Sequence, residues 1–184
     1  MHEEIIFAGF GGQGVMFVGQ LLAYTALAEE KHVTWIPSYG PEMRGGTANC
    51  TVVVSDEPIG SPVCKHPSVA VIFNNPSLEK YEAMVTPGGL LVVNSSMMVH
   101  PPTRTDLEVV MLPATATASE IGDVRVSNMI MLGAMLIHRA LVDRATVEHV
   151  LIEKLGTRKA HLQAINLTAF ERGITLGQTQ QASV

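Results

Sequence analysis

The residues nearest the N-terminus that could do chemistry form a glycine-rich turn, G-F-G-G-Q-G, between two apolar segments. The spacing matches G-x-G-x-x-G, in which the glycines allow a tight turn, close approach of a phosphate and close helix–strand packing. A helix that follows such a turn presents unpaired N–H groups and a partial positive charge to an anion. We expect an anion or partner contact at the residues of this turn: Gly9, Gly11, Gly12, Gln13 and Gly14.

A nicotinamide dinucleotide makes a second demand that the sequence does not meet. Its ribose hydroxyls need an acidic residue about 20 positions further on, at the end of the second strand. That strand ends with Trp35-Ile36-Pro37-Ser38, which contains no carboxylate, and Glu42 lies too far along the chain. NAD binding is therefore disfavoured. Two interpretations of the glycines stay open, a packing turn without a ligand and an anion or partner contact.

The segment 37–49 is the second region with residues that could recognise a ligand or a partner. It contains two prolines and three glycines, which predict a shaped loop without regular structure. Arg44 offers a planar, permanent charge that pairs well with carboxylate or phosphate. Tyr39 and Met43 would make apolar contacts if another chain lay against the loop.

Metal and nucleophilic chemistry is not expected of this chain. Cys50 and Cys64 are its two cysteines, too few for an iron–sulfur cluster, which usually takes four thiolates. We expect both to be free thiols. The seven histidines show no metal-ligand spacing. Ser95 and Ser96 follow a predicted strand, but they lack a G-x-S-x-G turn and a recognisable histidine partner. We therefore predict no catalytic residue and no metal site.

The composition argues against several partner classes. The net charge is −5 and the 12 Lys and Arg residues are scattered, so we expect no nucleic-acid partner. The apolar runs are too short and interrupted to cross a membrane, and the start M-H-E-E lacks the features of a secretion signal. We expect a cytoplasmic protein. Only 16% of the residues are charged, which favours either a large core or a partner over part of the surface.

The hydrophobic pattern predicts a Rossmann-like α/β domain with a mostly parallel sheet, helices on both faces and a group of C-terminal helices. The first strand, the helix after it and the second strand form a βαβ unit. We expect a single domain over residues 1–176 and a frayed tail over 177–184. Strands are predicted at 3–10, 33–36, 50–55, 69–73, 90–94 and 109–112. Helices are predicted at 15–30, 77–84, 114–121, 128–141, 146–155 and 160–172, the last closed by Gly173.

The glycine turn and the segment after the second strand are more specific together than either is alone. G-F-G-G-Q-G-V and P-S-Y-G-P-E-M-R-G-G resemble the gamma subunit of 2-oxoacid:ferredoxin (or flavodoxin) oxidoreductases. T-A-N-C-T-V-V-V-S, I-G-S-P-V and V-A-V-I-F-N-N-P-S-L-E-K-Y add to this resemblance, which covers most of the chain and is strongest from residue 5 to about 94. The loop residues that carry the family motif are Ser38, Tyr39, Gly40, Pro41, Glu42, Met43, Arg44, Gly45 and Gly46.

The resemblance implies a subunit of an enzyme that decarboxylates a 2-oxoacid to an acyl-CoA and CO2. In that family thiamine diphosphate is held mainly by the alpha- and beta-type subunits and iron–sulfur clusters by beta- or delta-type subunits, and coenzyme A is a co-substrate of the complex. Ferredoxin or flavodoxin receives the electrons. The chain itself would bind no cofactor alone, be inactive in isolation and self-associate as a homodimer. The loop looks most like the 2-oxoglutarate or branched-chain 2-oxoacid branch, more than the pyruvate branch.

Alternatives remain open at this point. The motif loop is interpreted as an intersubunit contact near the active centre, as a rigid loop folded on its own domain, or as a direct contact to coenzyme A phosphate; we favour the first. For the whole chain, the rivals are a stand-alone dinucleotide- or flavin-binding oxidoreductase and a purely architectural assembly module.

Overall fold

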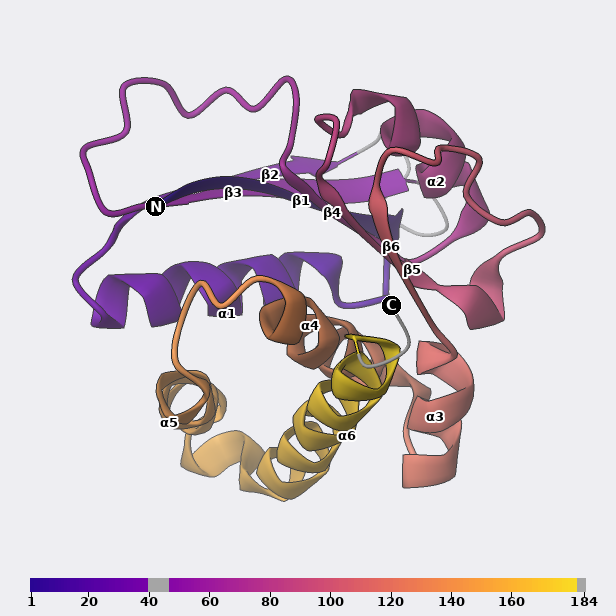
Figure 1. The fold of residues 1–184 in the computed structure, drawn as a ribbon. Coiled ribbons are helices and arrows are strands. Elements are labelled where there is room, and N and C mark those ends of the chain that lie inside the picture. Colours follow the sequence, from indigo (N-terminus) through magenta and orange to yellow (C-terminus); the bar gives the residue numbers. More distant parts are fainter. Residues whose placement is uncertain (40–46, 182–184) are drawn as a thin grey trace.

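The chain folds around one six-stranded sheet with the strand order β2-β3-β1-β4-β5-β6 (Figure 1). The computed structural model describes residues 1–39 and 47–181. Antiparallel pairing joins β3 to β1 and to β2, whereas the pairs from β1 through β4 and β5 to β6 are parallel, which confirms the mostly parallel sheet. The strands are β1 His2–Phe10, β2 His32–Tyr39, β3 Thr47–Ser55, β4 Val69–Ile72, β5 Leu90–Asn94 and β6 Glu108–Leu112.

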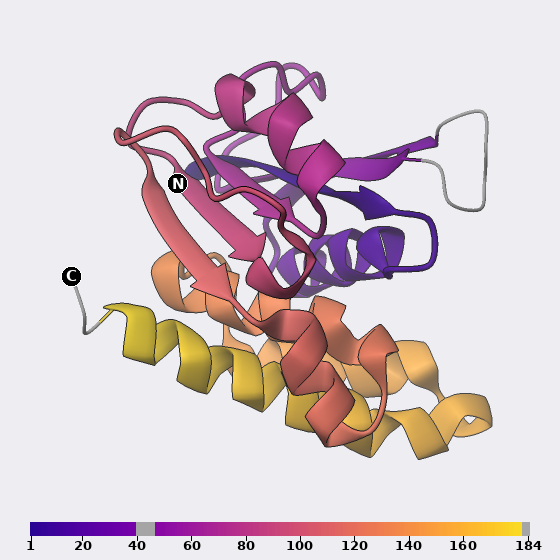
Figure 2. The same ribbon diagram turned by 90° about the vertical axis from the view of Figure 1, so that its right-hand side faces the viewer.

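Helices cover both faces of the sheet, as predicted, but unequally. One face carries α1 and the layer formed by α3, α4, α5 and α6, and the other carries the short α2 (Figures 1 and 2). The helices are α1 Val15–Ala28, α2 Asn75–Tyr81, α3 Ala114–Ile121, α4 Ser127–His138, α5 Arg144–Leu155 and α6 Gln163–Gln181.

The central strands are buried on both faces, which explains why they read as continuous apolar runs. In β1, Ile5 and Phe7 belong to the core beneath α1 and α4. Ile6 and Ala8, on the opposite face, pack in the smaller core beneath α2. This double burial fixes β1 in the middle of the sheet and thereby fixes the turn that follows it.

The prediction that 37–49 lacks regular structure is wrong at both ends of the segment. Ser38 and Tyr39 continue β2 and pair with Asn49 and Ala48 of β3. Pro37 is compatible with this ladder because β2 is an edge strand, where a missing N–H need not break a hydrogen bond. The motif residues Gly40–Gly46 lie outside the described residues. The predicted βαβ unit is also modified, because β3 lies between β1 and β2.

The prediction that Gly173 closes the last helix is wrong as well. α6 continues through Gly173 to Gln181, so residues 177–181, which the sequence places in a frayed tail, are helical. Gly173 is buried against the backbone of Ile130 in α4, and Gly133 of α4 is buried against the backbone of Phe170 in α6. Glycine is present because the two helices cross too closely for a side chain, a requirement that resembles a helix stop in the sequence.

Candidate functional site

The glycine turn lies at the carboxyl edge of the sheet, between the end of β1 and the start of α1. From β1 the chain passes through α1 to β2 and β3 on one side, whereas β4 pairs with the other side of β1. Ligands of open α/β sheets bind at such a reversal of strand order, outside the carboxyl ends of the strands. The turn therefore occupies the place in this fold where a binding site is expected.

Gln13 folds back over the turn instead of pointing outward. Its Oε1 accepts hydrogen bonds from the Phe10 N–H (2.6 Å) and from Asn74 Nδ2 (3.2 Å), and its Nε2 donates to the Phe73 carbonyl (3.4 Å). A Cβ on Gly9 would lie 2.6 Å from Gln13 Oε1 and 2.8 Å from the Phe73 Cβ. Gly9 is therefore needed to make room for the Gln13 amide, which ties the end of β1 to the end of β4.

Gly14 is held from the other side by Asn128, near the start of α4. Asn128 Nδ2 donates to the Gly14 carbonyl (3.2 Å), and a Cβ on Gly14 would collide with this amide. Gly14 also has a φ of +75°, which favours glycine. The motif predicts that Gly14 allows close helix–strand packing, but the close neighbour is a helix side chain from far along the chain.

Gly12 differs from its two neighbours in the motif. Its φ of +99° requires glycine, yet no heavy atom of the described residues lies within 4 Å of the position a Cβ would take. Within the described part of the chain, the first turn of α1 has neither an acidic residue nor a capping side chain. The backbone at Gly12 and the start of α1 are thus left available for an anion or for a partner chain.

A shallow pocket of about 210 Å³ opens beside the turn on the α4 side of the sheet. Its charged lining residues are Asp123, Arg125 and Lys159. Arg125 forms an ion pair with Asp123 (2.6 Å), and this hydrogen-bonded contact lowers the pKa of the Asp123 carboxyl. The full lining is Gly12, Gly14, Phe17, Asp123, Arg125, Val126, Asn128, Leu155, Lys159, Leu162 and Asn166.

Buried amides that the sequence analysis did not single out follow the neighbouring strands at the same edge. Asn74 accepts the Ser77 N–H (3.0 Å) and so caps α2. Asn94, at the end of β5, donates to Thr115 Oγ1 (2.8 Å) and accepts the Thr115 N–H (3.2 Å). Ser96 accepts the Ala116 N–H (3.2 Å), a structural role. Asparagine directly after an apolar strand run was the signal that could have revealed Asn74 and Asn94.

The structure brings the two sequence motifs to the same end of the sheet, the end at which β1 and β2 stop. Phe10, the last residue of β1, pairs with Thr47, and Tyr39, the last residue of β2, pairs with Ala48. The glycine turn and the start of the motif loop therefore leave the sheet two strands apart, about 10 Å by ordinary strand spacing. The motif residues Ser38 and Tyr39 lie at this edge, and the other motif residues fall outside the described residues.

The cysteines are unsuited to nucleophilic chemistry. Burial raises the pKa of the Cys50 thiol to about 12, and the thiol donates to the Val15 carbonyl. Burial also raises the pKa of Cys64 to about 12, and the neighbouring Glu4 adds to this shift. In residues 1–39 and 47–181 no group of three or more His, Cys, Asp or Glu side chains could hold a metal ion.

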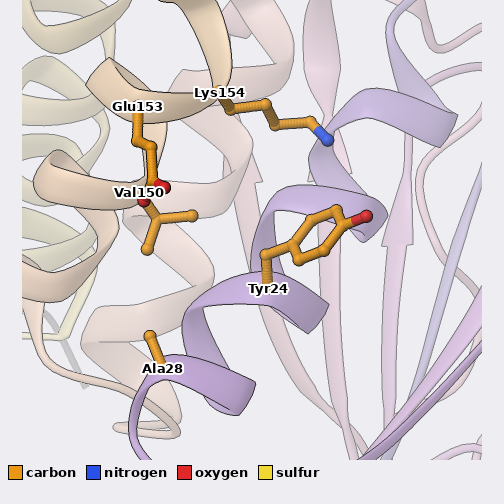
Figure 3. A pocket seen from close by; sticks show the side chains of 5 residues that line it. All are labelled: Tyr24, Ala28, Val150, Glu153 and Lys154. Carbon is orange, nitrogen blue, oxygen red and sulfur yellow. The ribbon is translucent and has the colours of Figure 1, made fainter.

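A second, larger groove of about 340 Å³ lies between α1 and α5 (Figure 3). Lys154 donates to Gln20 Oε1 (2.6 Å) and lies over the Tyr24 ring, 4.5 Å from its centroid. Burial lowers the pKa of Lys154. The remaining lining residues are Ala28, Val150 and Glu153, so the charged groups of this groove are one engaged cation and one carboxylate. No described helix is long and apolar enough to span a membrane.

A comparison with protein families finds a match that covers nearly all of the chain. The pattern of the family described as pyruvate ferredoxin/flavodoxin oxidoreductase matches residues 4–176. Among curated proteins, 2-oxoglutarate synthase subunit KorC of Methanocaldococcus jannaschii is 33% identical over 178 residues, covering 94% of this chain and 92% of KorC. Ketoisovalerate oxidoreductase subunit VorA of Methanothermobacter marburgensis is 43% identical over 129 residues, 70% of this chain but only 27% of VorA.

Solved structures of related enzymes have the same fold as this chain. The gamma subunit of a keto/oxoacid ferredoxin oxidoreductase from Geobacter sulfurreducens superposes with a TM-score of 0.82 at 26% identity, covering 96% of this chain and 99% of that one. A 2-oxoglutarate:ferredoxin oxidoreductase from Magnetococcus marinus, with 2-oxoglutarate, coenzyme A and succinyl-CoA bound, gives 0.89 at 26% identity. There the match covers 97% of this chain and 31% of the larger one.

Proposed function

The chain belongs to the pyruvate ferredoxin/flavodoxin oxidoreductase family, and we propose that it is the gamma subunit of a multisubunit 2-oxoacid:ferredoxin oxidoreductase. The reaction of the complex is the oxidative decarboxylation of a 2-oxoacid with coenzyme A to acyl-CoA and CO2. The two electrons released pass to ferredoxin or flavodoxin. The chain completes the complex and does not catalyse this reaction alone.

The observation that carries this proposal is the meeting of the two family motifs at one sheet edge. The glycine turn follows β1, and the motif loop begins where β2 ends, two strands away at the same end of the sheet. This edge offers the open backbone of Gly12 and the uncapped start of α1, groups that bind anions or another chain. Coenzyme A carries phosphates, and the Magnetococcus enzyme was solved with coenzyme A bound. We assign the turn to contact with coenzyme A phosphate or with the partner subunit that presents it.

Thiamine diphosphate and the iron–sulfur clusters are assigned to the alpha, beta and, where present, delta subunits. The residues of this chain do not fit a cluster, because it has two cysteines and both have strongly raised thiol pKa values. We therefore derive no catalytic step from this subunit. The complex works in the cytoplasm, and the isolated subunit forms a homodimer.

The substrate we propose is 2-oxoglutarate, with a branched-chain 2-oxoacid as the second candidate. The KorC proteins support the first, because they align over nearly their whole length with this chain. VorA supports the second through its higher identity over a shorter alignment. The motif loop, residues 38–46, also resembles these branches more than the pyruvate branch.

The motif loop is proposed to contact a partner subunit near the active centre, with Arg44 as its charged group. Replacing Arg44 by Ala in the whole complex separates this function from pure architecture. We expect a raised KM for coenzyme A with all subunits retained. Loss of subunits with an unchanged KM would instead indicate an architectural loop. Arg172→Ala, which removes an exposed arginine on α6, is the matched control.

The proposed function is tested by recovering the tagged chain from its native cells without oxygen. We expect larger partner chains, and reduction of methyl viologen that depends on thiamine diphosphate, on coenzyme A and on a 2-oxoacid, fastest with 2-oxoglutarate. Recovery of the chain alone, with tight binding of NADH or a flavin, would support the stand-alone oxidoreductase instead.

A further inference from the structure

We infer that Gln13 and Asn128 are positioning residues that hold the glycine turn in the conformation that the complex uses to bind coenzyme A. This inference rests on the proposed function, because coenzyme A is taken from it. The two side chains approach the turn from opposite sides, Gln13 from above the ends of β1 and β4 and Asn128 from α4. We call them the carboxamide clamp.

The Gln13 half of the clamp satisfies three polar groups at the ends of β1 and β4, one of which, the Phe73 carbonyl, also accepts from Asn94 Nδ2 (3.5 Å). Gln13 Oε1 accepts hydrogen bonds from the Phe10 N–H and from Asn74 Nδ2, and Gln13 Nε2 donates to the Phe73 carbonyl. Asn74 is 1% exposed, so loss of the Gln13 oxygen leaves a buried donor without its partner. An unpaired buried polar group is unfavourable, and the turn can relieve that cost by moving its backbone. The hydrogen bonds of Gln13 thus fix the position of the turn relative to the ends of β1 and β4.

The Asn128 half fixes the other end of the turn. Its Nδ2 donates to the Gly14 carbonyl, and its Oδ1 accepts the Met129 N–H (2.8 Å). Asn128 is 4% exposed and lies in the first turn of α4, a helix that packs against α6. The position of Gly14 is therefore set by the helical layer, and the position of Gly9 by the sheet through Gln13. Gly12, between these fixed points, is left with its open face outward.

This geometry predicts a particular kinetic signature. Coenzyme A reacts through its thiol, at the opposite end of the molecule from its phosphates. A contact to the phosphates therefore binds the ground state and the transition state about equally, and its loss raises KM without lowering kcat. A defect in folding or assembly would instead lower the amount of active complex and leave KM unchanged.

The test uses two variants of the whole, anaerobically purified complex. Gln13→Met keeps the length of the side chain and removes every hydrogen bond of the first half. Asn128→Ala removes the donor to Gly14 without placing a charge at this buried position, and the helix propensity of alanine supports α4, so it remains informative if the first variant fails to fold. Ser96→Ala removes one hydrogen bond at the same sheet edge, away from the turn, and serves as the matched control.

We expect each clamp variant to raise the KM for coenzyme A roughly five- to tenfold, the equivalent of one lost hydrogen bond, with kcat and the KM for the 2-oxoacid within about twofold. Ser96→Ala should match the wild type. Complexes that keep all subunits and an unchanged KM for coenzyme A in both variants would overturn the clamp while leaving the proposed function intact. A wild-type complex without activity that depends on coenzyme A would overturn the proposed function, and the clamp with it.

Discussion

Replacing Gly173 by Ala is the substitution whose effect follows most directly from the packing of this fold. The added Cβ would meet the carbonyl oxygen, the carbonyl carbon and the Cα of Ile130. These are backbone atoms inside α4, so they cannot move aside as a flexible side chain would. The clash can be relieved only by moving α6 away from α4, and Met129, Ile130 and Phe170 of the shared core would lose contacts.

Two opposing effects set the magnitude. Overpacking of this kind costs about 3 kcal/mol at the upper end of its usual range, because the neighbour is backbone. Alanine recovers about 1 kcal/mol of helix propensity relative to glycine. We therefore expect a net loss of about 2 kcal/mol in the free energy of unfolding, equivalent to a fall of about 4–8 °C in Tm for a chain of this size.

Urea unfolding followed by circular dichroism measures this difference, with Gly60→Ala as the matched control. Gly60 is exposed, and no described heavy atom lies within 4 Å of the position that an alanine methyl group would take there, so the same chemical change should be nearly neutral. A Gly173→Ala protein as stable as the wild type would refute the reasoning. It would mean that α4 and α6 do not cross as closely as their glycines indicate.

Two further predictions concern titratable groups. Burial raises the pKa of Cys50 and Cys64 to about 12, so few of these thiols are ionised at about pH 8, near the ordinary thiol pKa. Alkylation of the folded chain by iodoacetamide at that pH should therefore be slow and should become faster when the chain unfolds. Rapid labelling of Cys50 would contradict its burial. Burial alone would raise the pKa of Glu108, but hydrogen bonds from His138 and Arg139 outweigh it and lower that pKa. The loss of stability caused by Glu108→Gln should therefore be largest above pH 4.5, the ordinary pKa, and should decline as the pH falls below it. Urea unfolding of both proteins at a series of pH values measures this loss. A loss that stays constant down to about pH 3 would contradict the prediction.

The sequence predicts the strands and most helices of this fold because their signals are local. Val69–Ile72 and Leu90–Asn94 are short β-branched or leucine-rich runs bounded by turn residues, which is how a doubly buried strand reads. The errors arise where one residue type serves two purposes. Pro37 suggests the end of a strand but is tolerated at the sheet edge, and Gly173 suggests a helix stop but provides a close helix crossing. Only the tertiary neighbours distinguish these cases.

The candidate site shows the same division between local and distant signals. The position of the glycine turn could be predicted, because a glycine motif between a strand and a helix defines its place in such folds. The residues that hold the turn could not. Asn128 is 114 residues away from Gly14 in the chain, and Asn74 is 61 residues away from Gln13. No spacing rule connects residues at such separations, so the clamp becomes visible only when the strands and helices are assembled.

Removal and restoration of the chain test the central claim most directly. The complex would be purified without oxygen from cells that lack this chain, and assayed for dye reduction with 2-oxoglutarate and coenzyme A before and after adding the purified 184-residue chain. We predict no activity before the addition and recovery afterwards, together with incorporation of the chain into the complex. Full activity without the chain would contradict its assignment as an essential gamma subunit.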